Sequence, residues 1–402
     1  MKYGIYIAGG GKDAGKTTLS LGLVSYFKEH FPGEVAFTKP LGQKSTMVDG
    51  SSVGQDSYLL DTAMDLGIPL KYAAPFSTSS GAAEKYIKTG EPSDLRKNIR
   101  RSFNYLNSKY KYVVVEGTGH PGVGSVFDLG NADVASMLDI PVVLVLNGGI
   151  GSTIDRFSLS IEPFRNRKVR ILGVIINKVL PEKIDKVRSV LSEWFGSIEV
   201  PVLGFVPYLN TLSSPSLGVL SREMGAETLY LNDELNTKSV TGFHSAFGNT
   251  DEVLQIVEKE PGSALVASAG RRDVIEAVLA RRLSGALQDG PSAMILCGKT
   301  GIDNWVIEGC RKAGLPLFRS DAPFERTVKK IHHKIFKVEP GESQKIGNIV
   351  ELIRSHVDMD MIKERLSNPD VSIDTGESII SRVLSSPFRI FGKLLGRKNG
   401  SD

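Results

Sequence analysis

Short apolar runs alternate with amphipathic stretches along the first half of the chain. Leu19, Leu23, Val24 and Phe27 fall on one face of a helix over residues 17–27, as the helical period requires. Further helices are expected at residues 56–65, 94–106 and 183–194. Compact apolar runs, most of them rich in Val and Ile, occupy residues 3–8, 35–38, 112–115, 142–146, 171–176 and 202–206. Such runs suit strands buried on both faces, so the alternation predicts an α/β fold with a mostly parallel sheet and helices on both faces.

The apolar rhythm weakens over residues 209–249, where Ser, Asn, Thr and Gly are frequent. We place a domain boundary in this stretch, at residue 225. A second, smaller α/β pattern follows, with strands expected at 264–268, 293–297 and 315–318 and helices at 272–283, 304–312, 324–332 and 344–357. The predicted organisation is a first domain over 1–225, a second over 226–365 and a flexible basic tail over 366–402.

The tail combines basic and apolar residues. Residues 378–402 carry one acid and five basic residues, which are Arg382, Arg389, Lys393, Arg397 and Lys398. A cationic and apolar segment can lie on an anionic membrane. Pro387 and Gly392 interrupt any long helix there. The favoured interpretation is therefore a flexible solubilising tail, and membrane contact is not expected.

Composition excludes several classes of function. The 402 residues are 41% hydrophobic and 23% charged, with a formal net charge of +4, which is ordinary for a globular protein. The basic residues form no groove pattern with aromatics in the body of the chain, so no nucleic-acid partner is expected. Two cysteines, Cys297 and Cys310, are too few for a disulfide framework. Since residues 3–8 read as a strand rather than a signal peptide, we expect a cytoplasmic protein.

A glycine-rich segment lies between the first expected strand and the first expected helix. It fits the pattern G-x-x-x-x-G-K-[ST] at every position, with Gly10, Gly11, Lys12, Asp13, Ala14, Gly15, Lys16 and Thr17, and Thr18 follows it. Glycines let backbone N–H groups converge on phosphate oxygens, and the helix that follows adds the positive end of its dipole. Lys16 is expected to reach the terminal phosphates of ATP and the Thr17 hydroxyl to bind Mg²⁺. The alternative, a chance glycine-rich turn, is disfavoured by the flanking strand and helix, which predict a P-loop NTPase-type fold.

Two carboxylates are candidates for the rest of the magnesium site. Glu116 ends an expected strand, so its side chain would emerge at the carboxyl edge of the sheet, where ligands bind in open α/β folds. Asp56 begins an expected helix, and its alternative role is that of an acid favoured by the helix dipole. Gly298, Lys299 and Thr300 repeat Gly-Lys-Thr, but Ala293 stands where the first glycine is needed. We interpret that segment as a turn.

Several segments in order resemble one family. They are the phosphate loop and residues 38–42, Asp56, 113–119, 131–135, 148–152, 173–178 and 203–208. Together they resemble dethiobiotin synthetase, and more closely the dethiobiotin-synthetase-like domain fused to some phosphate acetyltransferases. The second domain resembles the DRTGG module that follows it in those enzymes, through residues 269–275 and 297–301. Arg271 stands where the namesake pattern has Asp.

The resemblance implies roles for individual residues. Lys16 and Lys39 would be catalytic, with Lys39 helping to bind a carboxylated amine and its activated phosphate; the alternative for Lys39 is a surface lysine after a strand. Asn177 would read the purine base through its amide edge. Asp56 and Glu116 would complete the magnesium shell begun by Thr17, and residues 117–119 would line an acceptor pocket.

Departures from the family limit what can be carried over. Dethiobiotin synthetases usually show Ser-Pro-His where they hold their diamine, whereas residues 75–81 contain no Pro-His. The diamine is therefore not the expected substrate. Nothing of the size of an acetyltransferase catalytic domain follows residue 365.

Three functional hypotheses follow. The favoured one is a Mg-ATP-binding protein, an ATPase with a regulatory, ligand-sensing second domain. The alternatives are an ATP-dependent carboligase of the dethiobiotin synthetase type and a free-standing regulatory subunit of a phosphate acetyltransferase. The expected partners are nucleotide, a second copy of the chain in a homodimer, and a phosphate acetyltransferase.

Overall fold

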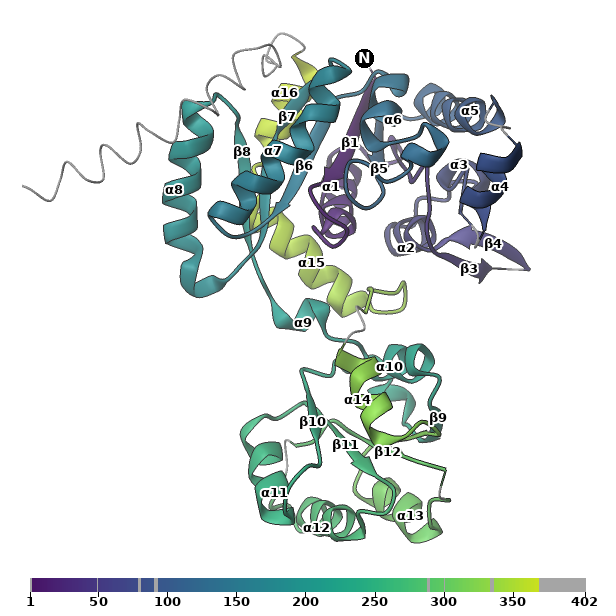
Figure 1. Cartoon of the computed structure of the whole chain (residues 1–402), viewed down its shortest axis with the longest axis vertical. Coiled ribbons are helices and arrows are strands. Elements are labelled where there is room, and N and C mark those ends of the chain that lie inside the picture. The colour runs from purple at the N-terminus through teal and green to yellow at the C-terminus, as the bar shows by residue number, and fades with distance from the viewer. Residues whose placement is uncertain are drawn as a thin grey trace, which may run out of the picture. The chain divides into compact units, whose positions relative to one another are not determined.

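A computed structural model describes residues 2–48, 50–78, 81–89, 93–287, 290–299, 301–332 and 336–368. Its contacts divide the chain into two compact units (Figure 1). The first unit comprises Met1–Tyr208 together with Ile346–Asp402, and the second comprises Leu209–Lys345. The first unit is therefore built from two separate stretches of sequence.

A six-stranded parallel sheet forms the centre of the first unit. Its strands run in the order β2 (Val35–Thr38), β5 (Tyr112–Glu116), β1 (Tyr3–Gly9), β6 (Val142–Asn147), β7 (Ile171–Val179) and β8 (Val202–Pro207). All five neighbouring pairs are parallel. The runs of Val and Ile are buried almost without interruption, as expected for strands with helices on both faces. The predicted strands and the predicted fold class are confirmed.

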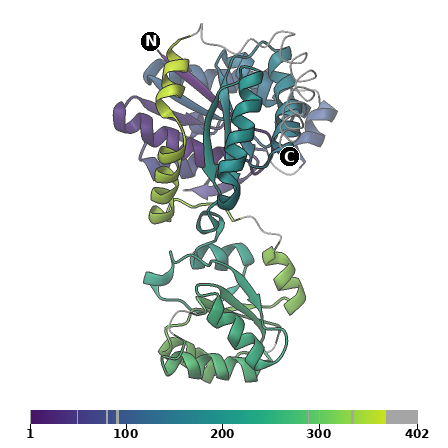
Figure 2. The same cartoon turned by 90° about the vertical axis from the view of Figure 1, so that its left-hand side faces the viewer.

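Helices connect these strands and cover the sheet on both faces, as Figures 1 and 2 show. They are α1 (Lys16–His30), α2 (Gln55–Met64), α3 (Leu70–Ala73), α4 (Ala82–Thr89), α5 (Ser93–Lys109), α6 (Asn131–Leu138), α7 (Gly151–Asn166) and α8 (Ile184–Ser197), with short 3-10 turns at Ser125–Phe127 and Pro181–Lys183. A hairpin of β3 (Ser45–Val48) and β4 (Ser51–Gly54) precedes α2. The sequence did not predict this hairpin, because β3 is exposed or half-buried and carries no apolar run.

The first unit is completed by residues 346–368, which we call the C-terminal strap. The strap contains most of α15 (Ser343–His356) and all of α16 (Met359–Ser367). Figures 1 and 2 show both helices, in yellow-green, beside the first sheet. Val357 forms an antiparallel bridge with Gly204, and Asp358 N donates to Leu203 O at 2.8 Å.

This arrangement differs from the boundaries expected at 225 and 365 and from the assignment of the helix at 344–357 to the second domain. Helical periodicity shows that a segment has an apolar face. It does not show which core that face covers, so the return of the chain to the first unit is invisible in the pattern.

The second unit has a five-stranded sheet of its own. The strand order is β10 (Phe243–Ser245), β11 (Ala264–Ser268), β12 (Ala293–Cys297), β13 (Leu317–Ser320) and β9 (Glu227–Tyr230), with β9 antiparallel. The helices are α9 (Asn210–Ser213), α10 (Leu217–Met224), α11 (Thr250–Lys259), α12 (Arg272–Leu283), α13 (Asn304–Lys312) and α14 (Phe324–His332), with a 3-10 turn at Asp233–Leu235. The two short edge strands, β9 and β10, fall within 209–249 and are only partly buried, which explains why the apolar rhythm weakens there.

Across the ranges that the structure describes, no helix is both long and apolar enough to cross a bilayer. We predict a flexible tail over 366–402. The structure places Leu366 and Ser367 at the end of α16, and residues 369–402, with the basic segment at 378–402, lie outside the described residues.

Candidate functional site

The phosphate loop joins the end of β1 to the start of α1. Gly15 caps α1 in the left-handed conformation, at φ 96°, which only glycine adopts without strain. A Cβ atom at Gly15 would also lie 1.9 Å from Asn177 Nδ2. Backbone conformation and close approach therefore both require glycine at this position of the motif.

Lys16 folds back over the loop that precedes it. Its buried ammonium donates to Gly119 O at 2.9 Å and, at 3.3 Å each, to the carbonyl oxygens of Gly11 and Lys12. Burial lowers the pKa of Lys16 to about 8, although Glu116 opposes the shift. A buried cation whose hydrogen bonds go to neutral carbonyls is well suited to bind an anion.

Glu116 lies at the centre of a hydrogen-bonded cluster at the end of β5. Its side chain is fully buried. Oε1 accepts from Thr17 Oγ1 at 3.0 Å and from Lys39 Nζ at 2.6 Å, while Oε2 accepts from Ser20 Oγ at 2.9 Å. The residue thus connects the first two turns of α1 to the loop after β2.

Lys39 links Glu116 to the second predicted carboxylate. Its Nζ lies 2.6 Å from Asp56 Oδ2, in the first turn of α2, and all three side chains are buried. Burial lowers the pKa of Lys39, but Glu116 and then Asp56 outweigh that effect and raise this pKa above its ordinary value. Lys39 is therefore a buried, charged residue, and the alternative of a surface lysine is wrong.

The structure brings together the three predicted magnesium ligands. Thr17 and Glu116 are in direct contact, and Asp56 joins them through the Lys39 ammonium. Within the described ranges no cluster of three or more His, Cys, Asp or Glu side chains could hold a metal ion. Mg²⁺ usually takes only one or two carboxylates and completes its shell with phosphate oxygens and water. Two carboxylates and a hydroxyl beside a phosphate loop fit that requirement.

Asn177, near the end of β7, supports the phosphate loop. Its Nδ2 donates to Ala14 O at 2.8 Å, and its Oδ1 accepts from Lys178 N at 2.9 Å. An amide nitrogen has two hydrogens, so one donor is left over from the contact with Ala14. Recognition of a purine base by that donor stays a prediction.

Ser20 and Asn131 belong to the site and carried no predicted role. Asn131, at the start of α6, accepts at Oδ1 from Tyr6 Oη and from Thr118 N, both at 2.9 Å. Its Nδ2 donates to Thr118 O at 3.0 Å and to His120 O at 2.8 Å. These bonds fix the loop after β5 that presents Gly119 O to Lys16. The signal available in the sequence for Asn131 was its place among the ordered segments that resemble dethiobiotin synthetase, which gives no contact partner.

The remaining loop residues line the rim of the site. Lys12 is exposed, whereas Asp13 and Thr18 are half-buried. Asp13 adds to the negative charge that favours the ammonium form of Lys16. In the second unit, Gly298 and Lys299 lie in a bend directly after β12, and Thr300 is outside the described residues.

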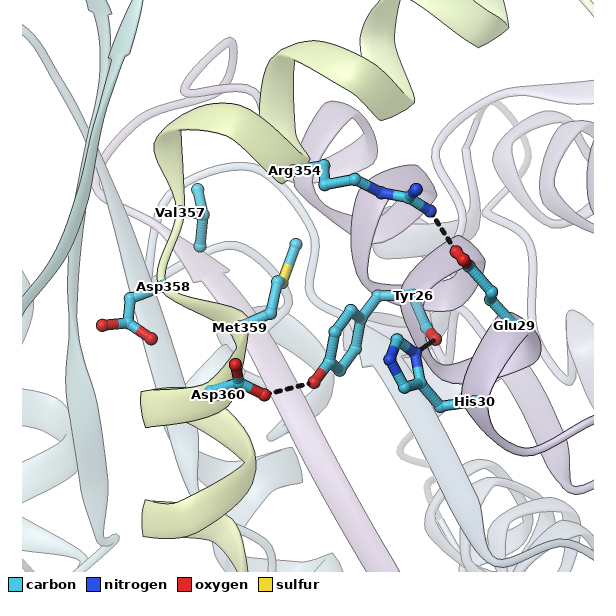
Figure 3. Close-up of a pocket in the computed structure, with 8 residues that line it drawn as sticks. All are labelled: Tyr26, Glu29, His30, Arg354, Val357, Asp358, Met359 and Asp360. Atoms are coloured by element: carbon cyan, nitrogen blue, oxygen red, sulfur yellow. Dashed lines mark hydrogen bonds and ion pairs between the residues drawn. The ribbon is translucent and has the colours of Figure 1, made fainter.

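A separate cavity of about 330 Å³ lies between α1 and the strap (Figure 3). It is at the far end of α1 from Lys16. Four of its polar side chains form two pairs: Tyr26 Oη donates to Asp360 Oδ1 at 2.7 Å, and Arg354 pairs with Glu29. It contains none of the predicted site residues, and its lining comes from the end of α1 and from the strap that packs against it.

A family model described as an AAA domain matches residues 3–216, more than half of the chain. The chain belongs to this family. In this AAA-domain chain a DRTGG domain follows at residues 219–334. The predicted pair, a phosphate-loop domain and then a DRTGG domain, is confirmed.

Two relatives match different lengths of the AAA-domain chain. A phosphate acetyltransferase from Nitratidesulfovibrio vulgaris is 25% identical over 377 residues, which cover 92% of this chain and 52% of that protein. An ATP-dependent dethiobiotin synthetase from Thermodesulfovibrio yellowstonii is 29% identical over 240 residues, which cover 54% of this chain and 94% of that protein. The chain therefore spans about half the length of the acetyltransferase.

Among solved structures, a cobyrinic acid a,c-diamide synthase from Mycobacterium smegmatis with bound ADP and magnesium is similar at a TM-score of 0.36 and 14% identity. The match covers 52% of this chain and 88% of that one. A score of this size supports no conclusion about the site.

Proposed function

We propose that the chain is a Mg-ATP-binding ATPase whose DRTGG domain senses a regulatory ligand. The observation that carries the proposal is the convergence of Lys16, Thr17 and Glu116 at one point beside the phosphate loop. A cation, a hydroxyl and a carboxylate at the carboxyl edge of a parallel sheet are what Mg-ATP needs.

Each group has a defined part in this proposal. The loop amides and the Lys16 ammonium would hold the β- and γ-phosphates, and Thr17, Asp56 and Glu116 would hold the metal. The bound Mg²⁺ would neutralise charge that develops on the transferring phosphoryl group. Lys39, linked to both carboxylates, would add a second protein cation close to that group.

The direct test replaces Lys16 by Ala. Because this ammonium is the buried cation of the loop, Lys16→Ala should weaken Mg-ATP binding by about ten- to a hundred-fold, from the loss of about 1.5–3 kcal/mol. Isothermal titration calorimetry with the full chain measures the effect. Lys186→Ala, an exposed lysine on α8, is the matched control and should bind as the unaltered chain does. Equal affinity for both variants would reject the assignment of the loop.

An ATP-dependent carboligase is the second candidate, since the synthetase relative is matched along 94% of its length. Phosphate release separates the two. An ATPase releases phosphate from Mg-ATP alone, whereas a carboligase requires an amine or carboxylate acceptor. The absence of Pro-His from residues 75–81 supports the ATPase and argues against the diamine.

We also propose that the chain forms a homodimer and acts on a phosphate acetyltransferase. The support for the acetyltransferase partner is the 25% identity with such an enzyme along nearly the whole of this chain. Light scattering during size-exclusion chromatography, with and without Mg-ATP, tests the dimer. Co-purification of an acetyltransferase activity tests the partner.

A further inference from the structure

The two carboxylates of the predicted metal site share one internal cation. Lys39 Nζ lies 2.6 Å from Asp56 Oδ2 and 2.6 Å from Glu116 Oε1. The exposed fractions of the side chains are 8% for Lys39, 8% for Asp56 and 1% for Glu116. The ammonium therefore lies between one oxygen atom of each carboxylate that is predicted to hold the metal.

Electrostatics explains why a cation is needed there. Two buried carboxylates repel each other and have lost their water, so without a counter-charge they would strongly destabilise the fold. Lys39 supplies that charge. An ammonium at 2.6 Å from these oxygens and a divalent ion bound to the same oxygens would repel each other at close range, so the two cations compete for the site.

The surroundings allow the ammonium to move while the backbone stays fixed. Lys39 N donates to Ala73 O at 2.9 Å, and Thr38 Oγ1 donates to Tyr72 O at 2.9 Å. The main chain is thereby held, and only the flexible side chain is left to shift. Glu116 Oε1 is bonded to Lys39 and to Thr17 alike, so the ammonium is already next to the residue that follows the phosphate-loop lysine.

We propose that Lys39 is an internal substitute for the metal ion. In the nucleotide-free protein its ammonium holds Asp56 and Glu116 together and excludes a divalent cation. When Mg-ATP arrives, the phosphates attract the ammonium away from the carboxylates and the metal takes its position. The inference rests on the proposed function, and it predicts that metal enters with the nucleotide and not before it.

The experiment titrates Mn²⁺, as the metal alone, into the nucleotide-free full chain and measures free Mn²⁺ by electron paramagnetic resonance. The variant is Lys39→Met, which keeps the length of the side chain and removes its charge. We expect weak binding by the unaltered chain and binding of one Mn²⁺ at least about ten-fold tighter by Lys39→Met, a difference of about 1.4 kcal/mol or more. Lys186→Met is the control and should bind as weakly as the unaltered chain. Equal affinities of Lys39→Met and the unaltered chain would overturn the proposal.

The unaltered chain gives a second test that does not depend on how well the variant folds. Tight binding of one Mn²⁺ without nucleotide, at an affinity that ATP leaves unchanged, would overturn the proposal. Failure of the proposed function is distinguishable. If the chain binds no ATP while Lys39→Met gains a Mn²⁺ site, Lys39 remains the internal cation that excludes the metal, whereas the ATPase and the displacement of Lys39 by nucleotide are both rejected. Thermal unfolding gives a third readout: Mn²⁺ should raise the Tm of Lys39→Met and leave that of the nucleotide-free unaltered chain unchanged. A Tm that does not respond in either protein would count against the substitution of metal by Lys39.

Discussion

At the scale of single residues, the site is a set of buried charges that compensate one another. Lys16 donates hydrogen bonds to carbonyl oxygens, whereas Lys39 forms ion pairs with Asp56 and Glu116. The motif alone identified Lys16 and Thr17, because the phosphate loop is contiguous in sequence. Asn131 could not be found in that way, since its partners Tyr6 and Thr118 are 125 and 13 residues away and a single sequence does not show which side chains meet.

The lowered pKa of Lys16 makes nucleotide binding sensitive to alkaline pH. The phosphates need the ammonium form, which is lost above pH about 8 in the free protein. Affinity for Mg-ATP should therefore begin to decrease between pH 7 and 8 and fall steeply from pH 8 to 10, as calorimetry can measure. The sign for stability is opposite: the folded pKa lies below the unfolded value, so between pH 8 and 10.5 the unfolded chain binds more protons and the Lys16 contribution to the free energy of unfolding rises.

The control for this prediction is Lys16→Arg, because a guanidinium stays charged across the same range. The affinity of Lys16→Arg for Mg-ATP, even if weaker, should not decrease above pH 8. The same decline in both proteins would assign the effect to another group.

At the scale of elements, two glycines make room for the C-terminal strap. A Cβ at Gly22, in the middle of α1, would lie 2.3 Å from Ile353 Cγ2, and a Cβ at Gly204 would lie 2.3 Å from His356 O. Glycine inside a helix is unfavourable by about 1 kcal/mol relative to alanine, so close packing explains its presence in α1. Strands and helices with strong periodicity were predictable, whereas the exposed hairpin of β3 and β4 and the partner of α15 were not.

A double-mutant cycle tests the contact between α1 and the strap. Gly22→Ala alone should destabilise the chain by about 1–3 kcal/mol through the clash with Ile353. In an Ile353→Gly background, which also removes the Cβ that would lie 2.6 Å from a Cβ at Gly22, the same change should be neutral or stabilising, by up to about 1 kcal/mol, because alanine favours the helix. Urea unfolding measures all four proteins. Additive effects would show that the two residues do not meet.

At the scale of the whole molecule, one unit is inserted into the other. The chain leaves the first unit after Tyr208 and re-enters it at Ile346. The sequence predicted two domains because it shows two α/β patterns. It gave no sign of the re-entry, because the strap has an ordinary helical pattern and lies directly after the second domain.

A truncated chain tests the importance of the re-entry. A protein that ends at residue 345 loses the buried side chains of Ile353, Val357, Ile362 and Leu366, and each buried aliphatic side chain contributes about 1.5–3 kcal/mol. We expect it to aggregate or to unfold at a much lower temperature. A protein that ends at residue 368 is the control and should unfold as the full chain does. Equal Tm values by calorimetry would show that the strap is dispensable.

The contact between Gly22 of α1 and Ile353 of the strap joins a helix that is synthesised early to a segment that is synthesised late. Domains generally fold as they leave the ribosome, the amino-terminal one first. Here the apolar surface of the first strands and α1 that the strap covers stays exposed while more than a hundred residues of the second unit are synthesised. The nascent chain is thus most vulnerable to proteases and to self-association in the interval before translation passes residue 366, and a chaperone would have its greatest effect there.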